Sequence, residues 1–178
     1  MFERCTWLNE PPACRIEGGV LHAVTGEQTD FWRITSYGFI RDSGHVFAAP
    51  VEGGFTAQVR VRADFTHLYD QAGLMVRIDE RRWLKAGVEF SDEQPMLSTV
   101  LTNELPDWAE TPAPPFADGF WLRMTVDQGV IRVQYSSDGM VWPMLRLAPF
   151  PVAQRYLVGP MCCSPQRAGF EVRFRECS

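Results

Sequence analysis

The chain has 178 residues, of which 46% are hydrophobic and 22% charged, with a formal net charge of −5. These values are typical of a soluble globular protein with a sizeable core, and we expect a single domain spanning residues 1–178. The acidic balance argues against a general nucleic-acid binder, which would show a basic face. The sequence has neither an apolar run of the roughly 18 residues that cross a membrane nor a signal peptide, so we expect a cytoplasmic protein without a membrane or nucleic-acid partner.

The sequence lacks the spacing patterns of metal and cofactor sites. No CxxC pair is present among the five cysteines, and the three histidines fall in separate segments: Cys5, Cys14, Cys162, Cys163, Cys177, His22, His45 and His67. We therefore expect reduced thiols, no structural zinc and no other metal site. The absence of GxSxG, P-loop and GxGxxG motifs predicts no cofactor. Of the adjacent Cys162 and Cys163, we expect one in the core and one at a strand end; a redox pair is the alternative.

The first part of the chain reads as short strands separated by Gly and Asp turns. Residues 1–17 predict an extended edge segment, and residues 20–24 and 45–49 predict short strands. Residues 29–38, TDFWRITSYG, are dense in aromatic and polar groups but do not alternate cleanly. This pattern suits a strand that leaves the sheet and carries a loop. Residues 55–63 alternate apolar and polar side chains and predict the most regular strand.

A hairpin at residues 72–79 and 83–90 is the central feature of the sequence. Apolar side chains alternate along both strands and predict a buried face: Ala72, Leu74, Val76, Ile78, Leu84, Ala86, Val88 and Phe90. The other face carries Arg77, Trp83, Lys85 and Glu89. One face therefore lies on the core, and the other is suited to binding a polar ligand.

The second half continues the strand pattern after a break. Residues 96–102 predict a strand, whereas the four prolines of residues 103–119 predict a surface loop. Further strands are expected at 120–126, 130–135, 156–162 and 169–175, with Leu122 and Val133 buried. No segment has helical spacing and caps. About ten to twelve short strands predict an all-β fold, a two-sheet antiparallel β-sandwich.

Four motifs resemble one known family. TDFWR (29–33), YDQAGLMVR (69–77), WLKAGVEF (83–90) and FWLR (120–123) are similar, in order and spacing, to the DUF1349 family. The resemblance covers essentially the whole chain and implies the fold of the concanavalin A-like lectins and glucanases, a jelly roll. A yeast member is described as a regulation-of-enolase protein, which implies a protein partner as one possible function.

The resemblance also implies where a ligand would bind, because lectin-like jelly rolls usually hold it on the concave face of one sheet. The candidate ligand-binding residues are Trp32, Tyr69, Asp70, Gln71, Arg77, Trp83, Lys85 and Glu89. Lys85, Glu89 and Arg77 are expected to lie together, with Trp83 at the rim. Trp32 is either an aromatic wall or a core residue. A saccharide needs this mixture of aromatic and polar groups.

Three alternatives to a saccharide-binding module remain. The polar face is otherwise a solvated surface whose ion pairs contribute little to stability, well under about 1 kcal/mol each. A protein-interaction or regulatory role acting on a metabolic enzyme is the second alternative. A glycoside hydrolase is the third, but it needs paired carboxylates, and Glu89-Phe-Ser-Asp92 breaks the ExDxxE spacing of jelly-roll glucanases. We therefore expect a non-catalytic protein.

Overall fold

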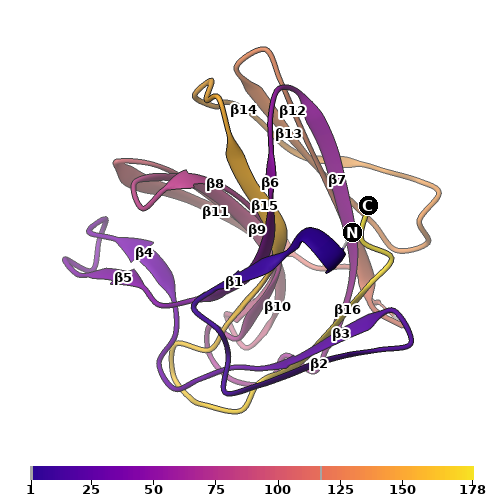
Figure 1. The fold of residues 1–178 in the computed structure, drawn as a ribbon. Helices are drawn as coiled ribbons and strands as arrows, with labels where there is room; N and C mark the ends of the chain where they lie inside the picture. The colour runs from indigo at the N-terminus through magenta and orange to yellow at the C-terminus, as the bar shows by residue number, and fades with distance from the viewer. Residues whose placement is uncertain (1, 117) are drawn as a thin grey trace.

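The computed structural model describes residues 2–116 and 118–178 and confirms the antiparallel β-sandwich (Figure 1). Its described part contains sixteen strands, one short 3-10 turn at Phe2–Arg4 and no α-helix. Two seven-stranded sheets face each other, and a third, two-stranded sheet lies outside them. No helix in the described ranges is long and apolar enough to cross a membrane.

Each large sheet is antiparallel throughout. The first sheet has the order β1 (Thr6–Leu8), β6 (His45–Val51), β15 (Tyr156–Cys163), β8 (Gln71–Asp79), β9 (Arg82–Ser91), β10 (Gln94–Asn103) and β11 (Leu105–Pro112). The second sheet has the order β14 (Met144–Pro149), β13 (Val130–Ser136), β12 (Phe120–Asp127), β7 (Phe55–Ala63), β16 (Glu171–Arg175), β3 (Val20–Val24) and β2 (Ala13–Glu17). The hairpin identified in the sequence, β8–β9, therefore lies inside the first sheet.

The main core fills the space between the two sheets. Of the residues expected to be buried, Ile78 and Phe90 are half-buried, and the others are at most 2% exposed: Ala72, Leu74, Val76, Leu84, Ala86, Val88, Leu122 and Val133. They belong to one hydrophobic cluster that both sheets supply. The apolar alternation thus identified the inward faces correctly.

Residues 105–112 form a strand, β11, where the sequence suggested a loop. Pro106 lies opposite Thr102 and Pro112 lies opposite Met96 in the antiparallel pairing with β10. β11 is the edge strand of its sheet, and an edge tolerates proline because half of its backbone N–H groups have no ladder partner. The expectation of a loop over residues 103–119 was wrong for this part.

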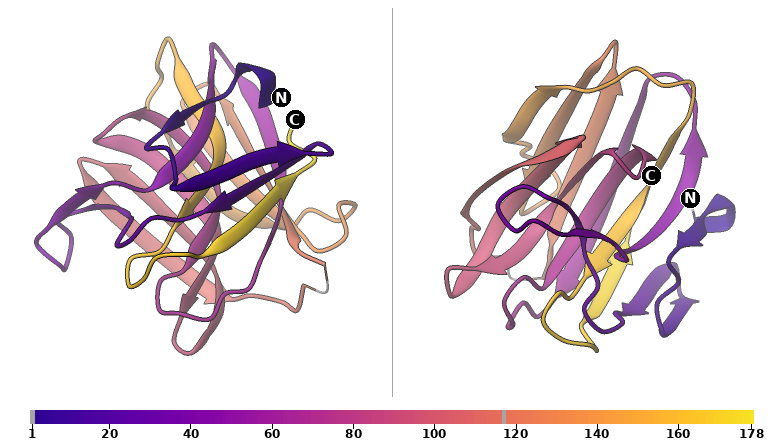
Figure 2. Two further views of the ribbon diagram at one scale, coloured as in Figure 1. Left: turned by 60° about the horizontal axis from the view of Figure 1, so that its bottom comes forward. Right: turned by 90° about the vertical axis from the view of Figure 1, so that its left-hand side faces the viewer.

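The two-stranded sheet is a hairpin, β4 (Phe31–Arg33) and β5 (Ile40–Asp42), which we call the flap (residues 31–42). In Figures 1 and 2 the flap stands out from the sandwich, on the side of the first sheet away from the second. Arg77 on β8 donates to both carboxylate oxygens of Asp42, at 2.6 and 2.8 Å. On the other side, Thr35 Oγ1 donates to the carbonyl oxygen of Pro106, at 3.1 Å. The flap is thereby fixed to β8 and to the edge strand β11.

The flap covers a second hydrophobic cluster on the outer face of the first sheet. This cluster contains Phe31, Trp32, Val46, Ala48, Met75, Trp83, Val100, Met161 and Cys163. Trp83 is only 1% exposed, so its expected place at a rim was wrong. Cys162 lies in the main core, and Cys163, the last residue of β15, lies in the second cluster. The first sheet is therefore buried on both faces along its central strands.

Candidate functional site

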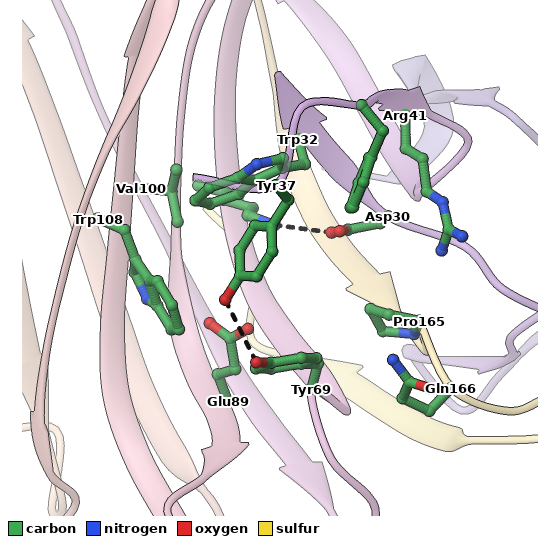
Figure 3. Close-up of a pocket in the computed structure, with 12 residues that line it drawn as sticks. Asp30, Trp32, Tyr37, Arg41, Tyr69, Glu89, Val100, Trp108, Pro165 and Gln166 are labelled. Carbon is green, nitrogen blue, oxygen red and sulfur yellow. Dashed lines mark hydrogen bonds and ion pairs between the residues drawn. The ribbon is translucent and has the colours of Figure 1, made fainter. Parts of the chain in front are cut away.

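A pocket of about 160 Å³ opens between the flap and the outer face of the first sheet (Figure 3). It is lined by Asp30, Trp32, Tyr37, Phe39, Arg41, Tyr69, Lys85, Glu89, Val100, Trp108, Pro165 and Gln166. The floor comes from β9 and β10, one wall from β11, and the cover from the flap and the residue before it. The volume is smaller than that of a drug-sized pocket and suits one small ring.

Aromatic side chains form the walls of the pocket. Trp32 meets Trp108 edge to face, with ring centroids 6.0 Å apart and planes at 82°. Trp108 meets Tyr69 at 6.3 Å and 73°, and Trp32 meets Tyr37 at 5.5 Å and 66°. The hydroxyl oxygens of Tyr37 and Tyr69 lie 3.4 Å apart. These four rings come from three separate parts of the chain and converge only in the folded protein.

The floor is a buried polar network centred on Lys85. Its ammonium group donates to Asp30 Oδ1 at 3.1 Å and to Gln71 Oε1 at 2.6 Å. The amide of Gln71 donates in turn to Glu89 Oε1 at 3.3 Å, and Ser98 Oγ donates to Glu89 Oε2 at 2.8 Å. Gln71 lies directly opposite Glu89 in the β8–β9 register, which allows this bridge. Lys85 is 4% exposed and Glu89 7% exposed, so both differ from the exposed pair expected on a solvated face.

Burial sets the protonation of this network. Desolvation raises the pKa of Glu89 to about 7, although nearby Lys85 and the hydrogen bond from Ser98 act in the opposite direction. For Lys85, burial is the largest single effect and lowers the pKa, but Asp30, Cys163 and Glu89 together outweigh it, Asp30 most of all, and the pKa is raised. Lys85, the only lysine in the chain, is therefore a fixed positive charge. A carboxyl group that titrates near neutral pH inside a pocket is a marker of functional sites.

The network keeps hydrogen-bonding capacity that faces the pocket. Lys85 has three donors and uses two of them within the described part of the chain. Asp30 Oδ1 accepts from Phe31 N and Lys85, whereas no group in residues 2–116 and 118–178 donates to Asp30 Oδ2. A hydroxyl both donates and accepts, so it fits between a free ammonium proton and a free carboxylate oxygen.

Only some of the sequence-predicted residues line this pocket. Trp32, Tyr69, Lys85 and Glu89 do, and Gln71 lies beside it as the bridge between Lys85 and Glu89. The structure places Arg77, Trp83 and Asp70 elsewhere: Arg77 anchors the flap through Asp42, Trp83 packs in the second cluster, and the fully buried Asp70 pairs with Arg167. These three contribute to the shape of the site rather than to its surface.

Three important lining residues were missed from the sequence: Asp30, Tyr37 and Trp108. Asp30 and Tyr37 lie in the irregular segment 29–38, where only Trp32 was selected. Trp108 lies in the proline-rich stretch that was expected to be a loop. The aromatic density of residues 31–37 was the available signal for Tyr37. Asp30 also brings a second carboxylate into the pocket beside Glu89. From the sequence, such a paired acid was sought only on the strand of Glu89, whereas Asp30 lies just before the flap. Within the described residues no cluster of His, Cys, Asp and Glu is arranged to hold a metal ion.

Comparisons with known proteins agree with the sandwich fold. The chain is 54% identical over 173 residues to "Regulation of enolase protein 1" of Saccharomyces cerevisiae, covering 97% of this chain and 87% of the relative. A crystal structure of a functionally unknown protein from S. cerevisiae superposes with a TM-score of 0.97 at 53% identity, covering 99% and 96% of the two chains. The carbohydrate-binding module CBM66 from Bacillus subtilis shares the fold, with a TM-score of 0.62 at 12% identity over 98% and 93%. The family model described as "Protein of unknown function (DUF1349)" matches residues 7–178, and the chain therefore belongs to the DUF1349 family.

Proposed function

We propose that this protein is a non-catalytic, lectin-like binding module that takes one saccharide unit into the pocket under the flap. The observation that carries the proposal is the combination of four aromatic walls with the Asp30–Lys85–Gln71–Glu89 network on one floor. Aromatic faces pack on the C–H surface of a sugar, and paired donors and acceptors bind its hydroxyls. The fold shared with a carbohydrate-binding module supports this proposal.

The proposal is tested by calorimetry and thermal shift against monosaccharides and short oligosaccharides. A saccharide that binds only the native state should raise the melting temperature. Trp108→Ala removes one aromatic wall and should weaken binding about tenfold or more. The matched control is Trp142→Ala, because Trp142 packs on Arg123 of the second sheet and does not line the pocket. If no saccharide binds, or if both variants behave alike, the proposal fails.

The two carboxyl groups of the pocket bear on whether the protein only binds a saccharide or also hydrolyses it. Asp30 and Glu89 provide two carboxyl groups, but Asp30 is held in an ion pair with Lys85. Jelly-roll glucanases commonly supply their paired carboxylates from one strand with ExDxxE spacing, whereas Asp30 and Glu89 come from different segments and Glu89-Phe-Ser-Asp92 breaks that spacing. We therefore expect no turnover of β-glucans or aryl glycosides. Turnover that disappears in Glu89→Gln would refute the non-catalytic proposal.

A protein partner is the second candidate function, and the flap is the observation that favours it. Four of its large apolar side chains are 39–54% exposed: Ile34, Tyr37, Phe39 and Ile40. Exposed apolar groups gathered on one projecting hairpin are typical of contact surfaces. The name of the yeast relative, "Regulation of enolase protein 1", points to a metabolic enzyme as such a partner. The cytoplasmic location and the single domain over residues 1–178 that we expect from the sequence remain predictions.

A further inference from the structure

The four aromatic side chains of the pocket form a closed ring around one carboxyl group. Each ring contacts the next, from Trp32 to Trp108, to Tyr69, to Tyr37 and back to Trp32. In Figure 3 the carboxyl group of Glu89 lies between Trp108 and Tyr69 and points toward the hydroxyl of Tyr37. The faces of aromatic rings are electronegative and attract cations, best of all in tryptophan. The four aromatic side chains and the carboxylate of Glu89 therefore both favour a positively charged ligand.

Glu89 differs from the other buried acids of the chain in having no cationic partner. Asp30 pairs with Lys85, and Asp70 pairs with Arg167. Within residues 2–116 and 118–178, the partners of Glu89 are the neutral side chains of Gln71 and Ser98. Lys85 is close enough for its charge to act on Glu89, but its ammonium group donates to Asp30 and to Gln71 rather than to Glu89. Burial outweighs this attraction and raises the pKa of Glu89 to about 7, so the ionised carboxylate is costly and a cation entering the pocket would stabilise it.

The remaining floor is suited to the hydroxyls of the same ligand. The free proton of Lys85 and the free oxygen Oδ2 of Asp30 lie on the other side of the Gln71 bridge from Glu89. The pocket thus offers two separate contacts. The Lys85–Asp30 ion pair, which has no net charge, can bind hydroxyls, and Glu89 supplies one acidic group among the four aromatic side chains. A small polar ring with hydroxyls at one edge and an ammonium group at the other matches both halves.

We propose that the preferred ligand is an amino sugar, whose protonated amine donates to Glu89 inside the aromatic ring while its hydroxyls bind Asp30 and Lys85. This inference rests on the proposed saccharide-binding function and adds the ligand's charge. It also assigns different tasks to the two halves of the network. Asp30 and Lys85 bind any saccharide, and Glu89 selects the charged one.

The test compares matched sugars that differ in one group. Glucose, galactose and mannose are titrated beside their 2-amino and 2-acetamido counterparts, by calorimetry at several pH values around neutral, because the amines must be protonated while Glu89, whose pKa is raised to about 7, is ionised. In at least one series the amino sugar should bind about tenfold or more tightly than both neutral members, as expected for a charge-assisted hydrogen bond. The acetamido sugars control for the substitution itself, because they carry the nitrogen without the charge.

The variant Glu89→Gln tests whether Glu89 is the group that causes the preference for amino sugars. It should reduce the affinity ratio between amino and neutral sugars to about one, since the amide keeps the size of the side chain and removes its charge. Glu93→Gln removes the same charge from the exposed turn between β9 and β10 and should leave the ratio unchanged. Equal affinity for amino and neutral sugars, or a preference that survives Glu89→Gln, overturns this inference and leaves saccharide binding intact. Failure of every sugar to bind overturns both proposals.

Discussion

At the scale of single residues, Lys85 and Glu89 show how far an alternating pattern can be interpreted. Their alternation with Leu84, Ala86 and Val88 correctly placed them on the face away from the main core. The alternative interpretation of this face as a solvated surface was wrong, because the flap covers it. Alternation reports which side of a sheet a residue occupies. It does not report what another segment places over that side.

The burial of Glu89 makes a prediction about stability and pH. Burial raises its pKa from an ordinary 4.5 to about 7, so between these values the native protein holds a proton that the unfolded chain releases. Below about pH 4.5 and above about pH 7, Glu89 has the same charge in the native and unfolded states, so its contribution to the free energy of unfolding does not change with pH there. Within that window, native stability should fall as pH rises, by roughly 3 kcal/mol in total.

Urea unfolding of the wild type and Glu89→Gln at several pH values between about 4 and 8 measures this effect. The difference between the two unfolding free energies isolates Glu89, because the other groups titrate in both proteins. The wild type should lose stability relative to the variant as pH rises. A constant difference across the range would mean that Glu89 has the same pKa in the native and unfolded states, so that burial does not raise it.

At the scale of elements, the flap is a strained hairpin whose tip serves the pocket rather than the fold. Ile34, Ser36 and Gly38 all have positive φ, at 59°, 65° and 73°. A left-handed conformation costs energy for residues with a side chain, most of all for a β-branched one such as Ile34. The tip supplies Tyr37 and Phe39 to the pocket, whereas Phe31 and Trp32 in β4 supply the buried packing.

Replacing residues 34–39 with a two-residue Asn-Gly turn should therefore separate binding from stability. The short turn suits a hairpin and removes the strained positions, which offsets the loss of the Thr35 hydrogen bond to Pro106, so the melting temperature should change by only a few degrees. Ligand affinity should fall about tenfold or more, since Tyr37 is lost from the aromatic walls. The fold is checked by circular dichroism. Unchanged affinity in the shortened protein would show that the pocket is not the binding site.

The strands themselves were predictable where the sequence alternates and were missed where it does not. β7, β8, β9 and β12 have the expected positions within one or two residues. β11 was missed because Pro106 and Pro112 argue against a strand unless the strand is known to lie at an edge. The order of strands in a sheet is a tertiary property, and local composition does not contain it. The same limit explains why Trp108 was not recognised as a lining residue.

At the scale of the whole molecule, the fold was more predictable than the site. The sandwich follows from apolar alternation repeated in many strands, which needs only local pattern. The pocket depends on contacts between distant segments. Asp30 meets Lys85 across 55 positions, and Thr35 of the flap reaches Pro106 across 71. Such contacts have no local signature, so the sequence predicted the floor of the site on β9 and missed most of its cover.

The two-sheet core makes the last prediction. Val88 is 1% exposed and packs in the cluster between the sheets, so Val88→Asp places an unpaired charge in the main core and should prevent folding. Val152→Asp is the matched control, because Val152 is 78% exposed and the same substitution there should be nearly neutral. Far-UV circular dichroism and urea titration compare the two variants. A soluble Val88→Asp protein that unfolds cooperatively would show that the strand faces are reversed, and the charged network under the flap would then lose its place on the outer face.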